Sequence, residues 1–250
     1  MAAATAPQGA TTQASASPAW RIAPLGDRCL VVEFGHRVDP EIACTVRSFA
    51  AHLLGNPPEG VLDVVPTFTT VAVHYRPQAF TGPELPHVEL RRQLEALLAH
   101  GVAGERVTAR VVEVPVCYGG EFGPDLDEVA AACRLSPQEV IGLHGASPHV
   151  VYMLGFAPGF PYIGGLDERL AVPRRSTPRT AIPAGSVAIA RDQSVIYPLE
   201  TPGGWNLIGR TPLPLFDASA EPPCLLQPGD EVRFVPVSLE QFQDMTERLA

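Results

Sequence analysis

An arginine-rich loop at residues 173–180, with the sequence PRRSTPRT, holds the residues of this chain that are best suited to bind an anion. It places Arg174, Arg175 and Arg179 among two prolines and three hydroxyl side chains. Guanidinium groups hold carboxylates and phosphates through paired hydrogen bonds, and every basic residue of this chain is an arginine. Chemistry that needs a lysine, such as a Schiff base or a P-loop, is therefore excluded. The alternative interpretation is a solvated loop with ordinary surface arginines.

A second segment, residues 152–165 (YMLGFAPGFPYIGG), alternates aromatic residues with glycine and proline and carries no charge. Rigid turns can point Phe156, Phe160 and Tyr162 into a shared cavity, and glycines let a ligand or another backbone approach closely. This pattern favours the wall of a binding pocket. The same rings could equally be plain hydrophobic core, with the glycines serving turns.

A third segment, residues 197–210 (YPLETPGGWNLIGR), presents Trp205 directly after the Gly203–Gly204 turn and brings Glu200 and Arg210 into the same stretch. Tryptophan is enriched both at ligand platforms and at contacts between subunits, because its large ring is apolar while its N–H can donate. Both roles fit this turn.

His144 is the histidine best placed for acid–base chemistry. It falls in the last turn of an expected helix, where the helix dipole favours its cationic form, and it precedes the aromatic segment closely enough to share its cavity. Its alternative role is to cap the carbonyls of that helix. The other histidines and the five scattered cysteines show no ligand spacing, so no metal site is predicted.

Composition limits the possible partners. The formal net charge is -9, and no block of like charge is long enough to hold a nucleic acid or an anionic membrane. The sequence contains no apolar run of about 18 residues, the length needed to cross a bilayer. Residues 1–18 predict a disordered tail rather than a signal or an anchor. An odd, scattered set of cysteines indicates free thiols in a reducing cytoplasm.

Residues 19–105 predict a small α+β domain. Strands are expected at 29–34, 61–66, 70–75 and 107–116, and helices at 40–55 and 85–100. The order strand, helix, strand, strand, helix, strand is the ferredoxin-like βαββαβ pattern, in which two helices cover one face of a four-stranded antiparallel sheet. Asp39 is the expected N-cap of the first helix, and Gly55 is expected to end it in a left-handed turn.

Residues 106–250 predict a second domain with a different texture. Two short helices come first, over 125–133 and 136–145, and the second opens with a capping box of serine and glutamate. Short β runs broken by glycine and proline then extend to Pro236, which favours a sandwich or a small barrel.

A final helix is expected from Ser238, where a second capping box closes at Gln241. Its apolar face carries Phe242, Met245 and Leu249. This face predicts a helix that packs on the barrel as a lid.

Six segments of the sequence are informative through their residues themselves, beyond the spacing of those residues. They are LGDRCLVVEFG, VPVCYGGEFGPDLDEVA, YMLGFAPGFPYIGGLD, PRTAIPAGSVAIA, YPLETPGGWNLIGRTP and LLQPGDEVRFVPV, and they span about residues 20–240 in order and without large gaps. With these segments the chain resembles the family of the 5-oxoprolinase B subunit. That family takes in the inhibitor of a sporulation histidine kinase and the first half of the carboxyltransferase part of urea carboxylase, once known as allophanate hydrolase subunit 1.

The resemblance implies a fold, a reaction and partners. The implied fold is α+β, a small N-terminal domain followed by a cyclophilin-like β-barrel. The implied reaction is the ATP-dependent hydrolysis of 5-oxoproline to glutamate, carried out by this chain as the B subunit together with the C and A subunits of 5-oxoprolinase. ATP is then a cosubstrate whose site belongs to another subunit or to a shared interface, because this chain has no phosphate loop.

The resemblance also implies which residues form the site. Segments 155–165, 174–185 and 202–210 are similar to the family's cleft, and His144 stands where the family pattern also has histidine. Residues 147–150 (SPHV) depart from that pattern and leave the lining near them open. The catalytic residues expected in this cleft are Arg179 or Arg174, on a small carboxylate, and His144, which positions or transfers a proton. The implied substrate-binding residues are Phe156, Pro158, Phe160, Thr180, Gly185, Gly203, Gly204, Trp205 and Arg210.

Two other functions fit the same residues. The chain could be a non-catalytic inhibitor whose cleft and Trp205 grip a histidine kinase. It could also be the carboxyltransferase half of a urea carboxylase-type enzyme. That reaction needs a biotin carrier from a partner, because this chain has no lysine to carry biotin.

Overall fold

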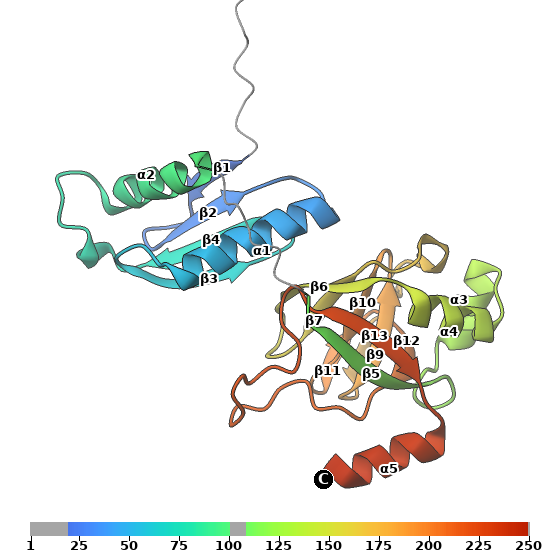
Figure 1. Cartoon of the computed structure of the whole chain (residues 1–250). Helices are drawn as coiled ribbons and strands as arrows, with labels where there is room; N and C mark the ends of the chain where they lie inside the picture. The colour runs from blue at the N-terminus through green and yellow to red at the C-terminus, as the bar shows by residue number, and fades with distance from the viewer. Residues whose placement is uncertain (1–19, 101–108, 250) are drawn as a thin grey trace, which may run out of the picture.

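The computed structural model describes residues 20–100 and 109–249, which form an α+β fold with one hydrophobic cluster in the N-terminal part and two in the barrel part. A helix-covered sheet lies beside a closed barrel (Figure 1). The expected tail and the expected boundary between residues 105 and 106 lie outside the described residues, so both stay predictions.

The first core lies between a four-stranded antiparallel sheet and two helices on one of its faces (Figure 1). Alternate strand residues such as Val32 and Val71 meet Phe49 and Leu94 from the helices. The sheet order is β1-β2-β4-β3. The elements are β1 (Arg21–Pro24), β2 (Cys29–Glu33), α1 (Pro40–Gly55), β3 (Val61–Pro66), β4 (Thr70–Tyr75), a 3-10 turn (Pro77–Ala79) and α2 (Pro86–Ala99).

The expected order of elements in this part is wrong at both ends. The fourth strand of the sheet is β1, which precedes β2 and pairs with it from Arg21↔Glu33 to Pro24↔Leu30. The strand expected to close the sheet is instead β5 (Val111–Tyr118), a barrel strand. Most of the length of β5 pairs in parallel with a strand near the C-terminus, so a distant partner decides where β5 lies. The strand β1 was missed because its four residues are too few to show a periodic pattern.

The ends of α1 follow the sequence only in part. The Asp39 carboxylate accepts a hydrogen bond from the Glu41 N–H at 2.9 Å and caps the helix as expected. The helix runs through Gly55 and is capped at Asn56, whose φ is -140°, so the expected left-handed glycine is absent from this end.

The second core fills a closed barrel with the strand order β10-β7-β6-β13-β5-β12-β9. This arrangement confirms the barrel, and it fits a cyclophilin-like fold. Beside it lies a two-stranded ribbon of β8 (Arg179–Ile182) and β11 (Thr201–Gly203). Besides β5, the barrel strands are β6 (His149–Leu154), β7 (Pro161–Gly164), β9 (Ser186–Ala190), β10 (Gln193–Ile196), β12 (Asn206–Arg210) and β13 (Glu231–Pro236).

The helices of this part lie outside the barrel, and α3 and α4 pack on it (Figure 1). They are α3 (Leu126–Cys133), α4 (Pro137–Ala146) and α5 (Leu239–Leu249), with a 3-10 turn at Glu168–Leu170. The expected capping box opens α4, where Ser136 and Glu139 each bind the other's backbone N–H.

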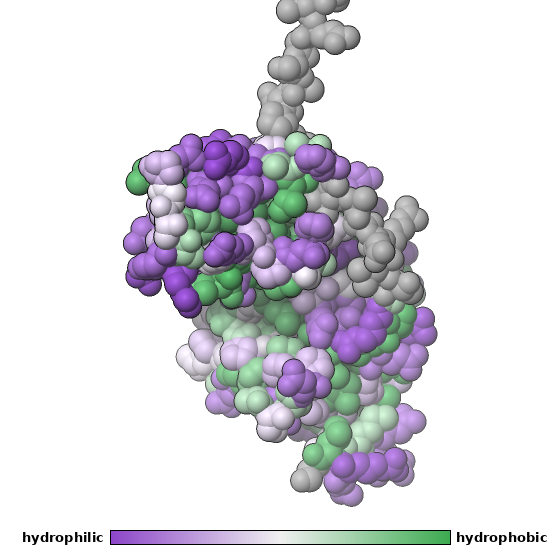
Figure 2. All heavy atoms as spheres, turned by 60° about the vertical axis from the view of Figure 1, so that its left-hand side comes forward, coloured by the Kyte–Doolittle hydropathy of each residue, from purple (hydrophilic) through white to green (hydrophobic). Residues whose placement is uncertain are grey.

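The final helix is not packed on the barrel along its length. Only Phe242 of α5 is buried, with its ring 4.5 Å from that of Phe122. Leu239 and Leu249 are about half exposed, and Figure 2 shows apolar side chains at the surface over this end of the molecule. The expected lid therefore buries Phe242 and leaves most of its other side chains exposed.

Candidate functional site

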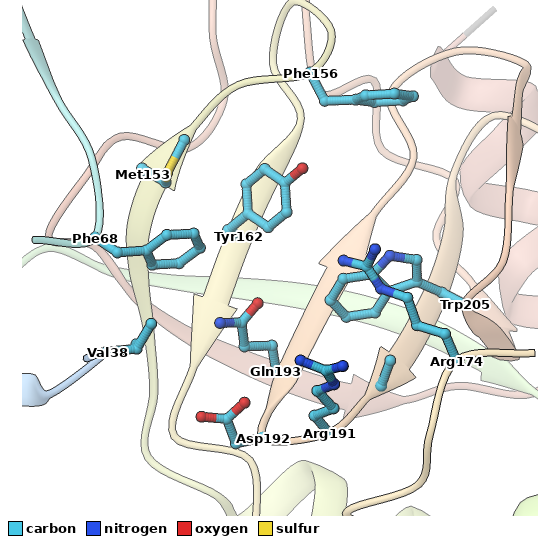
Figure 3. A pocket seen from close by; sticks show the side chains of 11 residues that line it. Val38, Phe68, Met153, Phe156, Tyr162, Arg174, Arg191, Asp192, Gln193 and Trp205 are labelled. Atoms are coloured by element: carbon cyan, nitrogen blue, oxygen red, sulfur yellow. The ribbon is translucent and has the colours of Figure 1, made fainter. Parts of the chain in front are cut away.

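A pocket of about 540 Å³ opens on one side of the barrel and combines aromatic side chains with charged ones (Figure 3). The barrel strands β6, β7, β9 and β10 each supply one lining residue, and loops and turns of the barrel part supply five more. Two loops of the N-terminal sheet, at residues 38 and 68, complete it. The lining residues are Val38, Phe68, Met153, Phe156, Tyr162, Arg174, Ala190, Arg191, Asp192, Gln193 and Trp205.

Arg174 is the pocket's best-placed cation among the residues expected from the sequence. Its guanidinium carbon lies 5.0 Å from the centroid of the Trp205 ring (Figure 3), and a cation over an aromatic face is worth about 0.5–2 kcal/mol. The Trp205 side chain is 6% exposed and so provides a firm platform. Arg174 itself is exposed and forms no ion pair with any residue of the described ranges, so its charge is available to a ligand.

The loop that carries Arg174 is tied to the turn that carries Trp205. The Arg175 N–H donates to the Gly204 carbonyl at 2.7 Å, and the Asn206 side chain donates to the Pro173 carbonyl at 2.9 Å. The sequence placed these two segments far apart, and these bonds bring the cation and the ring together.

Arg179 and Arg175 are held by a carboxylate of the chain itself. Asp125 is 2% exposed, and Arg179 donates to both of its oxygens at 2.8 Å. Arg175 donates to the same carboxylate at 2.8 Å and to Glu128 at 2.9 Å. Asp125 also accepts from the Leu207 N–H at 2.7 Å. The guanidinium of Arg179 therefore points at Asp125 and is absent from the pocket lining.

His144 lies inside the protein, away from the pocket. It is fully buried, with Nδ1 2.7 Å from the Tyr118 hydroxyl and Nε2 3.1 Å from the Ser194 hydroxyl. Burial, with a smaller contribution from His149, lowers the pKa of His144 well below its ordinary value. The expected cationic form is therefore disfavoured, because desolvation outweighs the helix dipole.

The aromatic segment serves both of the roles that its sequence allowed. Phe160 is buried core, and its ring centroid lies 5.2 Å from those of Phe156, Tyr162 and Tyr197. Phe156, by contrast, is 66% exposed at the rim of the pocket, and Tyr162 lies in its wall (Figure 3).

The remaining expected residues lie outside the pocket lining. Pro158 and Thr180 are exposed, and Gly203 pairs with Arg179 in the ribbon of β8 and β11. Arg210 is at the opposite end of β12 from Trp205, 5.5 Å over the Phe122 ring and next to Gly185. Burial lowers the pKa of Arg210, and its Nε is buried without a hydrogen-bond partner in the described structure.

Sequence reasoning missed the turn between β9 and β10, where Arg191, Asp192 and Gln193 line the pocket. Arg191 has a φ of 55° and Phe156 a φ of 71°, so two of the three non-glycine residues with positive φ in the described ranges face this pocket. Such a conformation costs about 1–3 kcal/mol and clusters at functional sites. A charged pair between two β runs was the available signal.

No group of three or more His, Cys, Asp or Glu side chains in residues 20–100 and 109–249 is arranged to hold a metal ion. None of the helices in those ranges has the length and apolar character to cross a membrane.

The chain belongs to the family described as carboxyltransferase domain, subdomain C and D, whose model matches residues 20–226. The B subunit of 5-oxoprolinase from Bacillus subtilis (strain 168) is 45% identical over 231 residues, which cover 89% of this chain and 95% of that protein. This agrees with the family that the sequence motifs resemble.

Solved structures share the fold. The structure named TTHA0988 is 40% identical, with a TM-score of 0.73 over 84% of this chain, and this chain spans only 40% of its length. The urea amidolyase of K. lactis is 21% identical, with a TM-score of 0.73 over 95% of this chain and 16% of that protein, and it shows the fold alone.

Removing the buried carboxylate should destabilise the protein. Asp125→Ala leaves the partly buried guanidinium of Arg179 without a partner and that of Arg175 with Glu128 alone, so we expect the free energy of unfolding to fall by about 3 kcal/mol in denaturant titration. Glu128→Ala is the matched control. Its side chain is 69% exposed, so we expect a loss below about 0.5 kcal/mol. Equal losses in the two variants would contradict the central role of Asp125.

The two glycines of the expected site should respond differently to a methyl group. A Cβ on Gly203 would lie 2.3 Å from the Tyr197 hydroxyl and 2.8 Å from Ile182, both buried, whereas on Gly204 the nearest atom is 3.6 Å away. We expect Gly203→Ala to cost about 1–3 kcal/mol of folding free energy and Gly204→Ala less than about 0.5 kcal/mol. Thermal and denaturant unfolding measure both, and similar losses would contradict this geometry.

Stability should fall at mildly acidic pH because of two buried imidazoles. Burial lowers the pKa of His149 to about 4 and that of His144 further. Below about pH 6.5 the unfolded chain therefore gains protons that the folded chain does not. Each imidazole then lowers the free energy of unfolding by about 1.4 kcal/mol per pH unit, down to its pKa in the folded protein.

Denaturant unfolding at several values between pH 4.5 and pH 7.5 measures this slope. His149→Gln should flatten it by about 1.4 kcal/mol per pH unit, whereas the control His74→Gln, at an exposed position, should leave it unchanged. A slope in His149→Gln equal to that of the unaltered protein would show that this imidazole does not stay neutral.

Proposed function

We propose that this chain is the B subunit of an ATP-dependent 5-oxoprolinase, which hydrolyses 5-oxoproline to glutamate together with partner subunits. One observation carries the proposal: an open pocket holds Arg174 on the Trp205 ring, and no carboxylate of the described residues forms an ion pair with it. The name and the 45% identity of the Bacillus subtilis relative support the reaction.

The pocket suits a small acid with an apolar ring. Its volume of about 540 Å³ falls within the usual range for ligand sites, and its wall joins aromatic rings to a few polar groups. Arg174 and Arg191 would hold the carboxylate, because guanidiniums form charge-assisted hydrogen bonds of about 1.5–3 kcal/mol. The volume exceeds that of the acid alone and leaves room for an activating group.

The chemistry explains why partners are needed. A lactam carbonyl is unreactive, so its oxygen must become a better leaving group, for instance by phosphorylation from ATP. This chain has no lysine and no phosphate loop, so we assign the ATP site to a partner, the C subunit or the A subunit, or to an interface shared with one. The five cysteines are free thiols, which suits a reducing cytoplasm.

The expected catalytic residues receive different roles. Arg174 contacts the substrate, whereas Arg179 acts as a positioning residue, because it fixes Asp125 and through it the loop that carries Arg174. We assign no chemical step to His144, because its ring is buried outside the pocket.

The reconstituted complex tests the proposal through the release of ADP that depends on 5-oxoproline. We expect Arg174→Ala and Arg191→Gly each to lower kcat/KM about 100-fold, since each removes a charged contact. Arg191→Gly should unfold at the same denaturant concentration or later, because glycine relieves the positive φ, so its loss of activity cannot come from misfolding.

Arg92→Ala, on the exposed face of α2, is the control and should keep full activity. Full activity in Arg174→Ala would refute the role of the pocket. A wild-type complex that shows no release of ADP with 5-oxoproline, but slows the autophosphorylation of a histidine kinase, would favour the inhibitor instead.

A further inference from the structure

The turn between β9 and β10 presents one cation and one anion to the pocket from consecutive residues. Arg191 and Asp192 both line it, and Figure 3 shows them beside Gln193, below the guanidinium of Arg174. Ala190 and Gln193 pair across this two-residue turn, so its two side chains leave from one tight point. Opposite charges are thereby offered to neighbouring atoms of one ligand.

Neither charge of this turn is satisfied within the described protein. In residues 20–100 and 109–249, Arg191 forms no ion pair and Asp192 accepts no hydrogen bond, although several other arginines there pair with carboxylates at 2.7–2.8 Å. Asp192 acts on its surroundings through its charge, which adds to burial in raising the pKa of Tyr152. Both side chains are exposed, so water solvates them in the free protein, and a ligand that displaces this water must itself supply a donor to the Asp192 carboxylate.

Backbone strain supports the use of the Arg191 side chain. A two-residue hairpin turn prefers glycine or asparagine where φ is positive, yet arginine occupies this position at 55°. The charge count also restricts the ligand. Arg174, Arg191 and Asp192 sum to one positive charge, which balances a monoanion and disfavours a dianion such as phosphate.

We propose that Asp192 selects ligands that carry an N–H donor on the carbon next to their carboxylate, with Arg191 and Arg174 on the carboxylate and Asp192 accepting from the N–H. This inference rests on the proposed function and deepens it, because 5-oxoproline has its lactam N–H at that position. The class excludes the lactone of the same ring. In the lactone an oxygen replaces the N–H, so lone pairs instead of a donor face the carboxylate of Asp192. Glutamate belongs to the class, since its ammonium occupies the same place.

Calorimetric titration of the reconstituted complex tests the selection with 5-oxoproline, its lactone analogue and inorganic phosphate. We expect the unaltered complex to bind the lactam about 10–100-fold more tightly than the lactone, and phosphate more weakly than the lactam. In Asp192→Ala the preference for the lactam should fall below about threefold. Asp192→Asn keeps an accepting oxygen without the charge and should show an intermediate preference.

Asp244→Ala, at an exposed position on α5, is the control and should keep the full preference. A preference unchanged in Asp192→Ala, equal binding of lactam and lactone by the unaltered complex, or phosphate as the tightest ligand would overturn the role of Asp192 while leaving 5-oxoproline as a ligand. A complex that binds neither lactam nor lactone would refute the proposed function itself. Denaturant unfolding of each variant identifies any loss that comes from misfolding.

Discussion

The geometry of the pocket depends on one buried carboxylate. Asp125 accepts from two guanidiniums and from a backbone N–H of β12, so it joins α3, the arginine loop and the barrel at one point. A buried ion pair of this kind contributes little net stability against an apolar substitute, but it leaves few alternative arrangements for its loop. The position of Arg174 over Trp205 follows from that restriction.

Arginines in this region divide into those with an internal partner and those without one. Arg175 and Arg179 pair with Asp125, and Arg175 also pairs with Glu128, whereas Arg174 and Arg191 face the pocket unpaired among the described residues. The first pair builds the site and the second pair is free to bind. Sequence alone treats all four alike, because the difference comes from a carboxylate fifty or so positions away.

Local signals in the sequence predicted local structure well and distant pairing poorly. The Asp39 cap, the capping box at Ser136 and the glycine-broken strands of the barrel follow from short-range chemistry. The place of β5 depends on a parallel partner more than a hundred residues later. In the site, the pairing of Arg174 with Trp205 needed two segments to meet, and the burial of His144 reversed the effect expected from its helix.

The pocket has walls from both parts of the chain. The Phe68 ring, from a loop of the N-terminal sheet, lies edge-on to Tyr152 and Tyr162 of the barrel at 6.1 Å and 5.6 Å. A molecule bound between these walls touches sheet and barrel together, so it strengthens their contact by the same free energy that the contact lends to binding. By this reciprocity, any partner that pulls the sheet from the barrel must also loosen the bound molecule.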